Sequence, residues 1–201
     1  MDETKLLNNK IELQNGNMLI FNVLVNGLPK LINYRAPNYL DDLAWKDINI
    51  LRLDWMIVNP NCEILKNSSY LIYDLNIHNN ANFESINGIS DKMREEDGRT
   101  FKSIVEYLNN DIKDFDIKYI VSHGSDVNFN LLLIEYLRHD LDINVFKDKI
   151  IINTKQFMWK KSLDERLDSI DCCKVLINGN KQTKLQMTYS LLKFRTLLKH
   201  D

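Results

Sequence analysis

Three apolar runs that suit β-strands follow one another early in the chain, before any helical pattern begins. They are NMLIFNVLV (17–25), INILRLDWMIVN (48–59) and SSYLIYDL (68–75). The turn sequences NGLP (26–29) and PN (60–61) close the first two runs,. Consecutive strands of this kind pair antiparallel, so this half of the chain predicts an antiparallel meander.

The second half of the chain instead alternates between helical and strand patterns. Apolar residues at helical spacing predict helices over 98–113, 126–139, 156–168 and 183–199, with short strands at 118–122 and 150–152,. A meander followed by this alternation predicts an α/β fold of three layers. Its centre is a mixed five-stranded sheet with helices on both faces.

The domain organisation expected from the sequence is simple. A chain of 201 residues with 44% hydrophobic content is long enough to bury one substantial core,. Residues 1–16 are polar and are expected to form an arm, and 17–201 a single domain. Residues 30–47 contain a proline and several aromatic residues, and we expect a long connecting loop there,.

Charge and the cysteines exclude several classes of protein. The 26 basic and 28 acidic residues give a net charge of −2, so no overall basic field indicates a nucleic-acid or membrane binder,. No signal sequence and no membrane-length apolar run is visible, and we expect a soluble, intracellular (cytoplasmic) protein with no membrane partner. Cys62, Cys172 and Cys173 have the spacing of neither a disulfide framework nor a zinc site,.

Common catalytic and nucleotide-binding signatures are also missing. There is no glycine-rich phosphate loop, no G-x-S-x-G elbow and no H-E-x-x-H pair,. Ser125 or Asp126 is expected to cap the helix that follows. The aromatic residues Tyr34, Tyr39 and Trp45 are expected to pack in the protein and not to form a base-stacking platform.

MLIFNVLVNGLPK (18–30) and VSHGSDVNFNLLLIE (121–135) are two segments that resemble motifs of one enzyme family, the DEDDh 3′-to-5′ exonucleases. MLIFNVLVNGLPK (18–30) resembles their first motif, which reads as an F-D-x-E-T-T-G-L-P-K type sequence. VSHGSDVNFNLLLIE (121–135) resembles their second motif, V-G-H-N-x-x-F-D-x-N-x-L-x-x-E. A weaker likeness to the third motif, A-H-N-A-L-A-D-V-x-A-T, lies at NKQTKLQMTYSLLKF (180–194). The intervening strands follow in register, so the resemblance spans 18–199 and implies a ribonuclease H-like fold.

The resemblance also implies a catalytic centre that this sequence does not reproduce. Members of the family hold two Mg²⁺ or Mn²⁺ ions with four carboxylates and use a histidine as general base. The sequence has Asn22 and Leu24 at the two first-motif acids and Asn128 at the second-motif acid. In the best register Lys181 and Gln186 stand at the third-motif histidine and aspartate. No catalytic residue or metal ligand of the family is intact, so we expect no metal cofactor.

Three nearby carboxylates, Asp54, Asp126 and Glu135, are candidates to replace the missing ligands. One stray carboxylate does not rebuild a two-metal site, because Mg²⁺ requires several anionic oxygen ligands. The sequence therefore favours a catalytically inactive, exonuclease-like domain, a pseudoenzyme.

Three functional hypotheses follow. The domain is a structural or partner-binding subunit, with an exposed apolar surface around Trp45, Trp55 or Trp159. Alternatively, it binds single-stranded nucleic acid in the old active-site groove, with Lys30, Arg35 and Lys181 against the phosphates. The third hypothesis is an active metal-dependent exonuclease with an unusual site.

Overall fold

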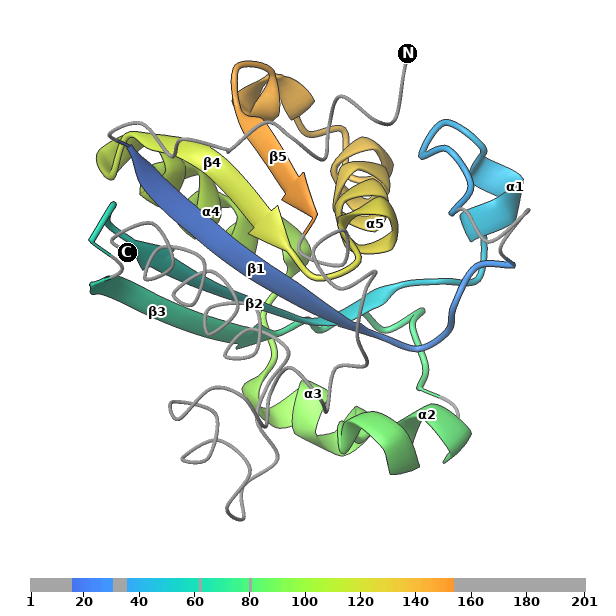
Figure 1. The fold of residues 1–201 in the computed structure, drawn as a ribbon. Helices are drawn as coiled ribbons and strands as arrows, with labels where there is room; N and C mark the ends of the chain where they lie inside the picture. Colours follow the sequence, from blue (N-terminus) through green and yellow to red (C-terminus); the bar gives the residue numbers. More distant parts are fainter. Residues whose placement is uncertain (1–15, 31–35, 62, 80, 154–201) are drawn as a thin grey trace, which may run out of the picture.

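The computed structural model describes residues 16–30, 36–61, 63–79 and 81–153 of the chain (Figure 1). Its centre is a five-stranded sheet in the order β3-β2-β1-β4-β5. The strands are β1 (Asn17–Val25), β2 (Ile50–Val58), β3 (Ile64–Leu71), β4 (Ile117–Ser122) and β5 (Ile150–Asn153). β1, β2 and β3 pair antiparallel, whereas β4 and β5 run parallel to β1. The mixed five-stranded sheet predicted from the sequence is confirmed.

One face of the sheet is covered by two long helices, α4 (Phe101–Asp114) and α5 (Ser125–Arg138). α4 begins after Thr100, whose side-chain hydroxyl accepts a hydrogen bond from the Ser103 amide at 3.4 Å,. The helices and the sheet share one buried cluster, which includes Leu19, Phe21, Leu53, Trp55, Ile104, Val105, Leu108, Leu131, Leu132 and Tyr136. Both helices were expected from their apolar spacing.

The opposite face of the sheet carries a second buried apolar cluster. Its members are Met18, Ile20, Met56, Val58, Tyr119, Val121 and Ile152. Because β1 is central and buried on both faces, its sequence is apolar without alternation,. The helices expected at 156–168 and 183–199, and residues 1–15 of the expected arm, lie outside the described residues.

Four shorter helical elements complete the described part. They are α1 (Asp42–Trp45), α2 (Ala81–Asn87), α3 (Asp91–Asp97) and the 3₁₀ helix η2 (Ile143–Phe146). α2 contacts β1, and α3 contacts β3 (Figure 1). The prediction of a loop throughout 30–47 is wrong at α1, where the Asp41 side chain accepts a hydrogen bond from the Ala44 amide at 3.4 Å. No helix among the described residues is long and apolar enough to cross a membrane.

The third strand begins and ends earlier than predicted. We expected 68–75, but β3 runs from Ile64 to Leu71 at the edge of the sheet. Its middle residues are polar, so hydrophobic alternation does not mark its start. The backbone pairing with β2 ends after Ile72. The next residue, Tyr73, donates its amide to the carbonyl oxygen of Arg99 at 2.8 Å instead.

Candidate functional site

The second half of β1 directs Asn22 and Leu24 to the same face of the sheet, because side chains alternate along a strand. Asn22 is buried, with 2% of its surface exposed, and Leu24 is half-buried. On β2, Asp54 is the cross-strand partner of Asn22, and Arg52 is the partner of Leu24. The two positions that the sequence resemblance assigns to metal-binding acids are therefore faced by one carboxylate and one guanidinium.

Asp54 is a buried carboxylate whose two oxygens are both in use. Arg52 Nε lies 3.0 Å from its Oδ1 and 3.1 Å from its Oδ2. The hydroxyl of Ser69, its cross-strand partner on β3, donates to Oδ1 at 2.6 Å. A buried carboxylate needs both an opposite charge and hydrogen bonds, and the two neighbouring side chains provide them. Asp54 is thus the centre of an internal ion pair.

Asn22 lacks this kind of support. Its side-chain oxygen is buried and has no hydrogen-bond partner among the described residues. An unpaired buried polar atom costs about 1–3 kcal/mol of stability. The amide at this position is therefore not explained by the contacts of the described part of the chain.

Asn128 lies in the first turn of α5, at the carboxyl end of β4. The preceding Gly124 has a φ of 73°, a left-handed conformation that favours glycine, and no side chain caps this helix,. The expected cap by Ser125 or Asp126 is therefore wrong. The Asn128 amide donates to Ser122 Oγ at 2.8 Å and to the carbonyl oxygen of His123 at 3.1 Å.

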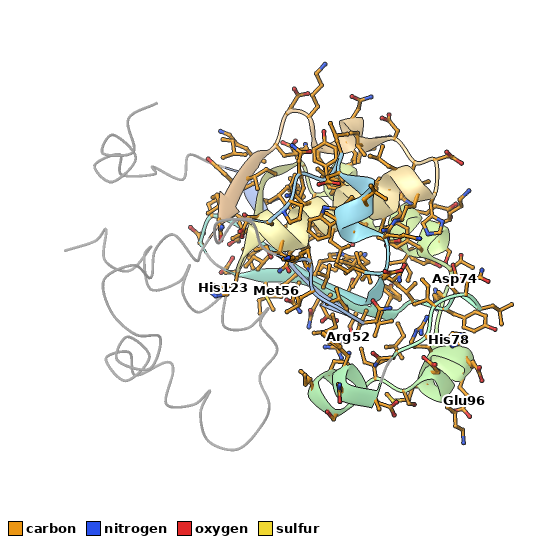
Figure 2. The ribbon with its side chains drawn as sticks, turned by 90° about the vertical axis from the view of Figure 1, so that its right-hand side faces the viewer. Arg52, Met56, Asp74, His78, Glu96 and His123 are labelled. Carbon is orange, nitrogen blue, oxygen red and sulfur yellow. The ribbon has the colours of Figure 1, made fainter. Side chains whose placement is uncertain are left out.

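The strand register relates Asn128 to Asn22. β1 and β4 run parallel and pair as far as Ile20 opposite Val121, so Asn22 and His123 each lie two residues beyond the last pair,. The Asn128 side chain donates a hydrogen bond to the backbone carbonyl oxygen of His123. Figure 2 shows where His123, Met56 and Arg52 lie on the sheet. The topology therefore brings the first-motif and second-motif positions together at the carboxyl ends of β1 and β4.

The remaining predicted site residues are placed only in part. Lys30 follows β1 and is exposed, as expected of a phosphate contact. Arg35, Lys181 and Gln186 lie outside the described residues. Their predicted roles remain predictions.

The residues near the carboxyl ends of β1 and β4, with Asp54 of β2 beside them, do not fit a pair of divalent metal ions. Within residues 16–153 as far as they are described, no three His, Cys, Asp or Glu side chains are grouped to hold a metal. Asn22 and Asn128 offer uncharged oxygens at best, and Leu24 offers none. Asp126 accepts a hydrogen bond from Asn153 at 3.4 Å, and Asp54 is bound by Arg52. The donor set lacks the anionic charge that two-metal chemistry requires.

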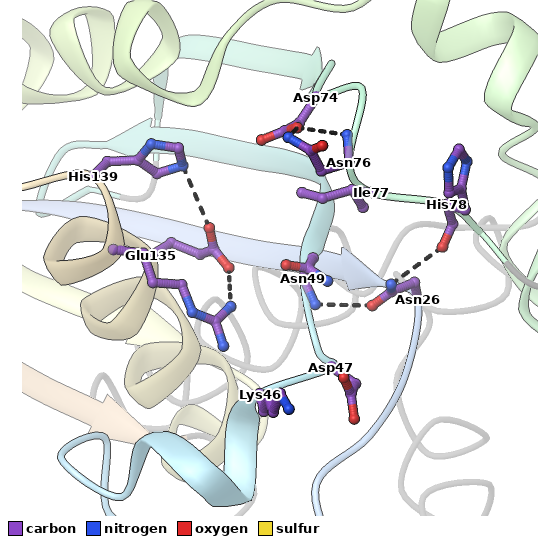
Figure 3. A pocket seen from close by; sticks show the side chains of 11 residues that line it. Asn26, Lys46, Asp47, Asn49, Asp74, Asn76, Ile77, His78, Glu135 and His139 are labelled. Atoms are coloured by element: carbon purple, nitrogen blue, oxygen red, sulfur yellow. Dashed lines mark hydrogen bonds and ion pairs between the residues drawn. The ribbon is translucent and has the colours of Figure 1, made fainter.

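Glu135, the third candidate carboxylate, belongs to a different place, a polar pocket of about 540 Å³. Figure 3 shows this pocket between the end of α5 and the segment that follows β3. Glu135 contacts Arg138 at 2.6 Å and His139 at 3.7 Å. The lining residues are Asn26, Lys46, Asp47, Asn49, Asp74, Asn76, Ile77, His78, Glu135, Arg138 and His139. No local sequence pattern indicates this pocket, because its residues come from four separate segments of the chain.

Burial dominates the electrostatics of the pocket. Desolvation raises the pKa of Glu135 from 4.5 to about 6, against the opposing effect of Arg138,. Desolvation also lowers the pKa of His139. Arg138 further donates to the carbonyl oxygens of Ile48 and Trp45, at 2.7 and 2.6 Å. Glu135 and Arg138 therefore connect the end of α5 to the segment between α1 and β2.

Glu135 is expected to make stability depend on pH between 4.5 and about 6. In this range the folded protein binds more protons than the unfolded chain, so the contribution of Glu135 to stability falls as pH rises, by about 2 kcal/mol. The variant Glu135→Gln cannot titrate and should lack this component. Urea unfolding of both proteins across the pH range measures it, with Glu84→Gln on the exposed surface of α2 as a control. A difference between wild type and Glu135→Gln that does not change with pH would contradict this expectation.

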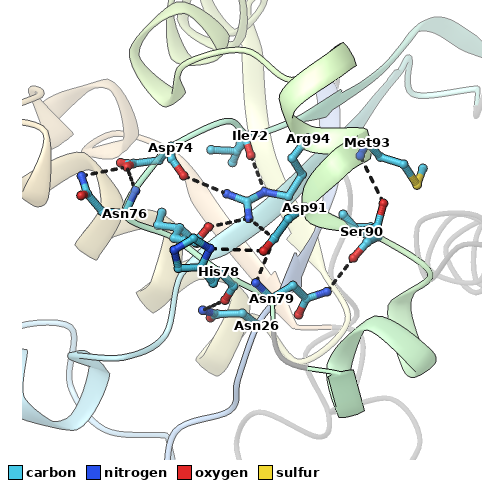
Figure 4. Close-up of polar contacts among 12 residues, drawn as sticks. Asn26, Ile72, Asp74, Asn76, His78, Asn79, Ser90, Asp91, Met93 and Arg94 are labelled. Atoms are coloured by element: carbon cyan, nitrogen blue, oxygen red, sulfur yellow. Dashed lines mark hydrogen bonds and ion pairs between the residues drawn. The ribbon is translucent and has the colours of Figure 1, made fainter.

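A buried arginine, Arg94 of α3, fixes the segment that lines the pocket (Figure 4). Its Nε donates to the carbonyl oxygen of Ile72 at 2.8 Å, and Nη1 donates to that of Ile77 at 2.8 Å. Nη2 reaches the carbonyl oxygen of Asp74 at 3.5 Å, and Asp91 pairs with Nη1 at 3.0 Å. One guanidinium thus holds both ends and the middle of the segment 72–77.

The aromatic residues singled out from the sequence lie largely in the core. Trp45 and Trp55 are fully buried, so neither indole contributes to an exposed apolar surface. Trp45 Nε1 donates to the carbonyl oxygen of Asn38 at 3.0 Å, and Tyr39 packs against the same core. These residues pack, as expected of the Tyr39 and Trp45 cluster. Tyr34 and Trp159 lie outside the described residues.

The sheet order and its helices define the α/β fold of the ribonuclease H-like exonucleases. Solved structures of exonuclease I share this fold. A product-bound exonuclease I matches with a TM-score of 0.67 and 9% identity over 92% of this chain and 44% of its own. Exonuclease I of E. coli in complex with a dA16 oligonucleotide matches with a TM-score of 0.66 and 9% identity, over 90% and 41%. The enzyme of Methylocaldum szegediense gives 0.65 and 9%, over 89% and 40%.

These comparisons establish the fold and no more, because the identity is so low. The chain spans less than half the length of the exonuclease I chains that it matches. No protein-family model and no curated protein sequence matches the chain.

Proposed function

We propose that the chain is a catalytically inactive domain with the exonuclease fold, a pseudonuclease that serves as a binding subunit. The observation that carries this proposal is the replacement of the β1 acids by Asn22 and Leu24, with Arg52 paired to the one carboxylate opposite them. Two-metal hydrolysis needs anionic ligands on both ions, to activate water and to stabilise the leaving oxygen. An amide and an aliphatic side chain supply neither charge nor a bridging carboxylate.

The expected result in a nuclease assay is no shortening of a 5′-labelled single-stranded DNA or RNA, with Mg²⁺ or Mn²⁺ present. Denaturing gels measure product lengths against a reaction without protein. The proposal fails if the oligonucleotide is shortened in a reaction that EDTA stops and that Asp54→Asn abolishes. Shortening that is unchanged in Asp54→Asn would instead come from a contaminating nuclease, since Asp54 is the buried carboxylate of this face.

A second candidate function, binding of single-stranded nucleic acid, is favoured over the tryptophan-centred protein interface. Trp45 and Trp55 are buried and so cannot form the centre of that interface. Arg52 supplies a cation on the face of Asn22 and Leu24, and exposed Lys30 follows the same strand. An exonuclease I with this fold was solved with an oligonucleotide, and another with SSB-Ct. Binding of labelled single strands over a salt series tests this function, because phosphate contacts weaken steeply with salt.

A further inference from the structure

The guanidinium group of Arg52 is paired through its Nε, while its two terminal nitrogens have no partner among the described residues. Its Nε is 3.0 and 3.1 Å from the two oxygens of Asp54, whose side chain is only 4% exposed. The Arg52 side chain is 25% exposed. Its two terminal nitrogens make no hydrogen bond to any other described residue. Nε contributes one N–H of the guanidinium, so four of the five N–H groups are left for another partner.

Asp54 in turn is fixed by the sheet around it. It lies on β2 between β1 and β3, and Ser69 of β3 donates to its Oδ1 at 2.6 Å. A buried carboxylate with this support gives the arginine a defined orientation and a low entropic cost of binding. Asp54 therefore acts as the positioning residue for Arg52.

The charge balance of this face does not favour a cation. Asn22 and Leu24 carry no charge, and Arg52 and Asp54 compensate each other. The face therefore has no excess of negative charge to be neutralised by an added cation. An ion-paired guanidinium with free N–H groups still binds phosphate, because its planar fork matches two phosphate oxygens.

We propose that Arg52, positioned by Asp54, binds a backbone phosphate of a single-stranded nucleic acid and takes the place of a divalent cation there. The inference rests on the proposed function, in that the face binds without cutting. It differs from metal-dependent binding in a way that is easily measured. Binding requires Arg52 and does not require Mg²⁺ or Mn²⁺.

Fluorescence anisotropy with a labelled oligothymidylate, in buffer that contains EDTA, tests the inference. Arg52→Met is expected to weaken binding about tenfold to a hundredfold, the loss of charged hydrogen bonds to one phosphate. It should also reduce the slope of log affinity against log salt by about 0.7. Arg52→Lys keeps the charge without the fork and should lose less affinity. Arg99→Met is the matched control, since Arg99 lies over the rings of Tyr70 and Tyr107 on the face covered by α4.

Three outcomes would overturn the inference. They are no binding by the wild type in EDTA, binding that appears only with a divalent cation, and equal binding by wild type and Arg52→Met. Melting temperatures of all variants show whether each is folded. Asp54→Asn, which loosens Arg52 without removing its charge, should weaken binding less than Arg52→Met. Cleavage of the oligonucleotide on adding Mg²⁺ would overturn the proposed inactivity alone, because the test of Arg52 is made in EDTA.

Discussion

Replacement of Arg94 by methionine is expected to lower the free energy of unfolding by about 3–5 kcal/mol, because each buried carbonyl oxygen left without a donor costs about 1–3 kcal/mol. Arg94 is 2% exposed, so methionine fills most of its volume but leaves the buried hydrogen bonds unmade. The carbonyl oxygens of Ile72 and Ile77 would then lose their donor. Asp91 would also lose its buried partner. Urea unfolding at neutral pH, followed by circular dichroism, measures the change.

Two further variants make this expectation specific. Lys92→Met, two residues earlier on the exposed face of α3, breaks only the pair with Glu96 at 3.7 Å. It should change stability by less than about 1 kcal/mol. Arg94→Lys keeps the charge but reaches fewer of the carbonyl oxygens, so it should fall between wild type and Arg94→Met. A loss below about 1 kcal/mol in Arg94→Met would show that the segment 72–77 does not depend on this side chain.

Arg94 also shows why part of the fold escaped prediction. The strands and long helices were found because each buries a continuous or periodic set of apolar side chains. α2 buries none of its residues, and the only buried residue of α3 is Arg94. These helices are held by capping, by hydrogen bonds and by one guanidinium. Hydrophobic periodicity carries no signal for such elements.

The candidate site was likewise predicted only in part. The motif resemblance predicted that Asn22, Leu24 and Asn128 occupy family positions, and the sheet topology brings the strand and helix that carry them together. Asp54 is one of the three carboxylates that the sequence indicates near these positions, whereas Arg52 was not predicted, because it becomes the neighbour of Leu24 only through the β1–β2 register. A register is fixed by pairing across the whole strand, and no local pattern around Arg52 indicates it.

Asn22→Asp is expected to destabilise the protein near neutral pH by about 2–3 kcal/mol. The new carboxylate would be buried in a cross-strand pair with Asp54, at a Cβ separation of about 5 Å,. At an effective dielectric constant of about 20, two unit charges at this distance repel by about 3 kcal/mol. Arg52 already compensates Asp54 and has no second charge to offer. Thermal melts of wild type and variant over a pH series measure the penalty.

The pH and metal dependence of this variant tests the origin of the penalty. Burial and Asp54 should raise the pKa of the new carboxyl above its usual range, so the folded state binds a proton more tightly than the unfolded chain. Stability lost at neutral pH should then return as pH falls through the raised pKa. Mn²⁺ should raise the melting temperature of Asn22→Asp combined with Arg52→Met, in which both carboxylates are unpaired, and leave the wild type unchanged. Asn22→Ala removes the unpartnered oxygen without adding charge and should not show either dependence. If Asn22→Asp were as stable as wild type at neutral pH without metal, the asparagine would be an incidental substitution, and charge compensation by Arg52 would not govern this face.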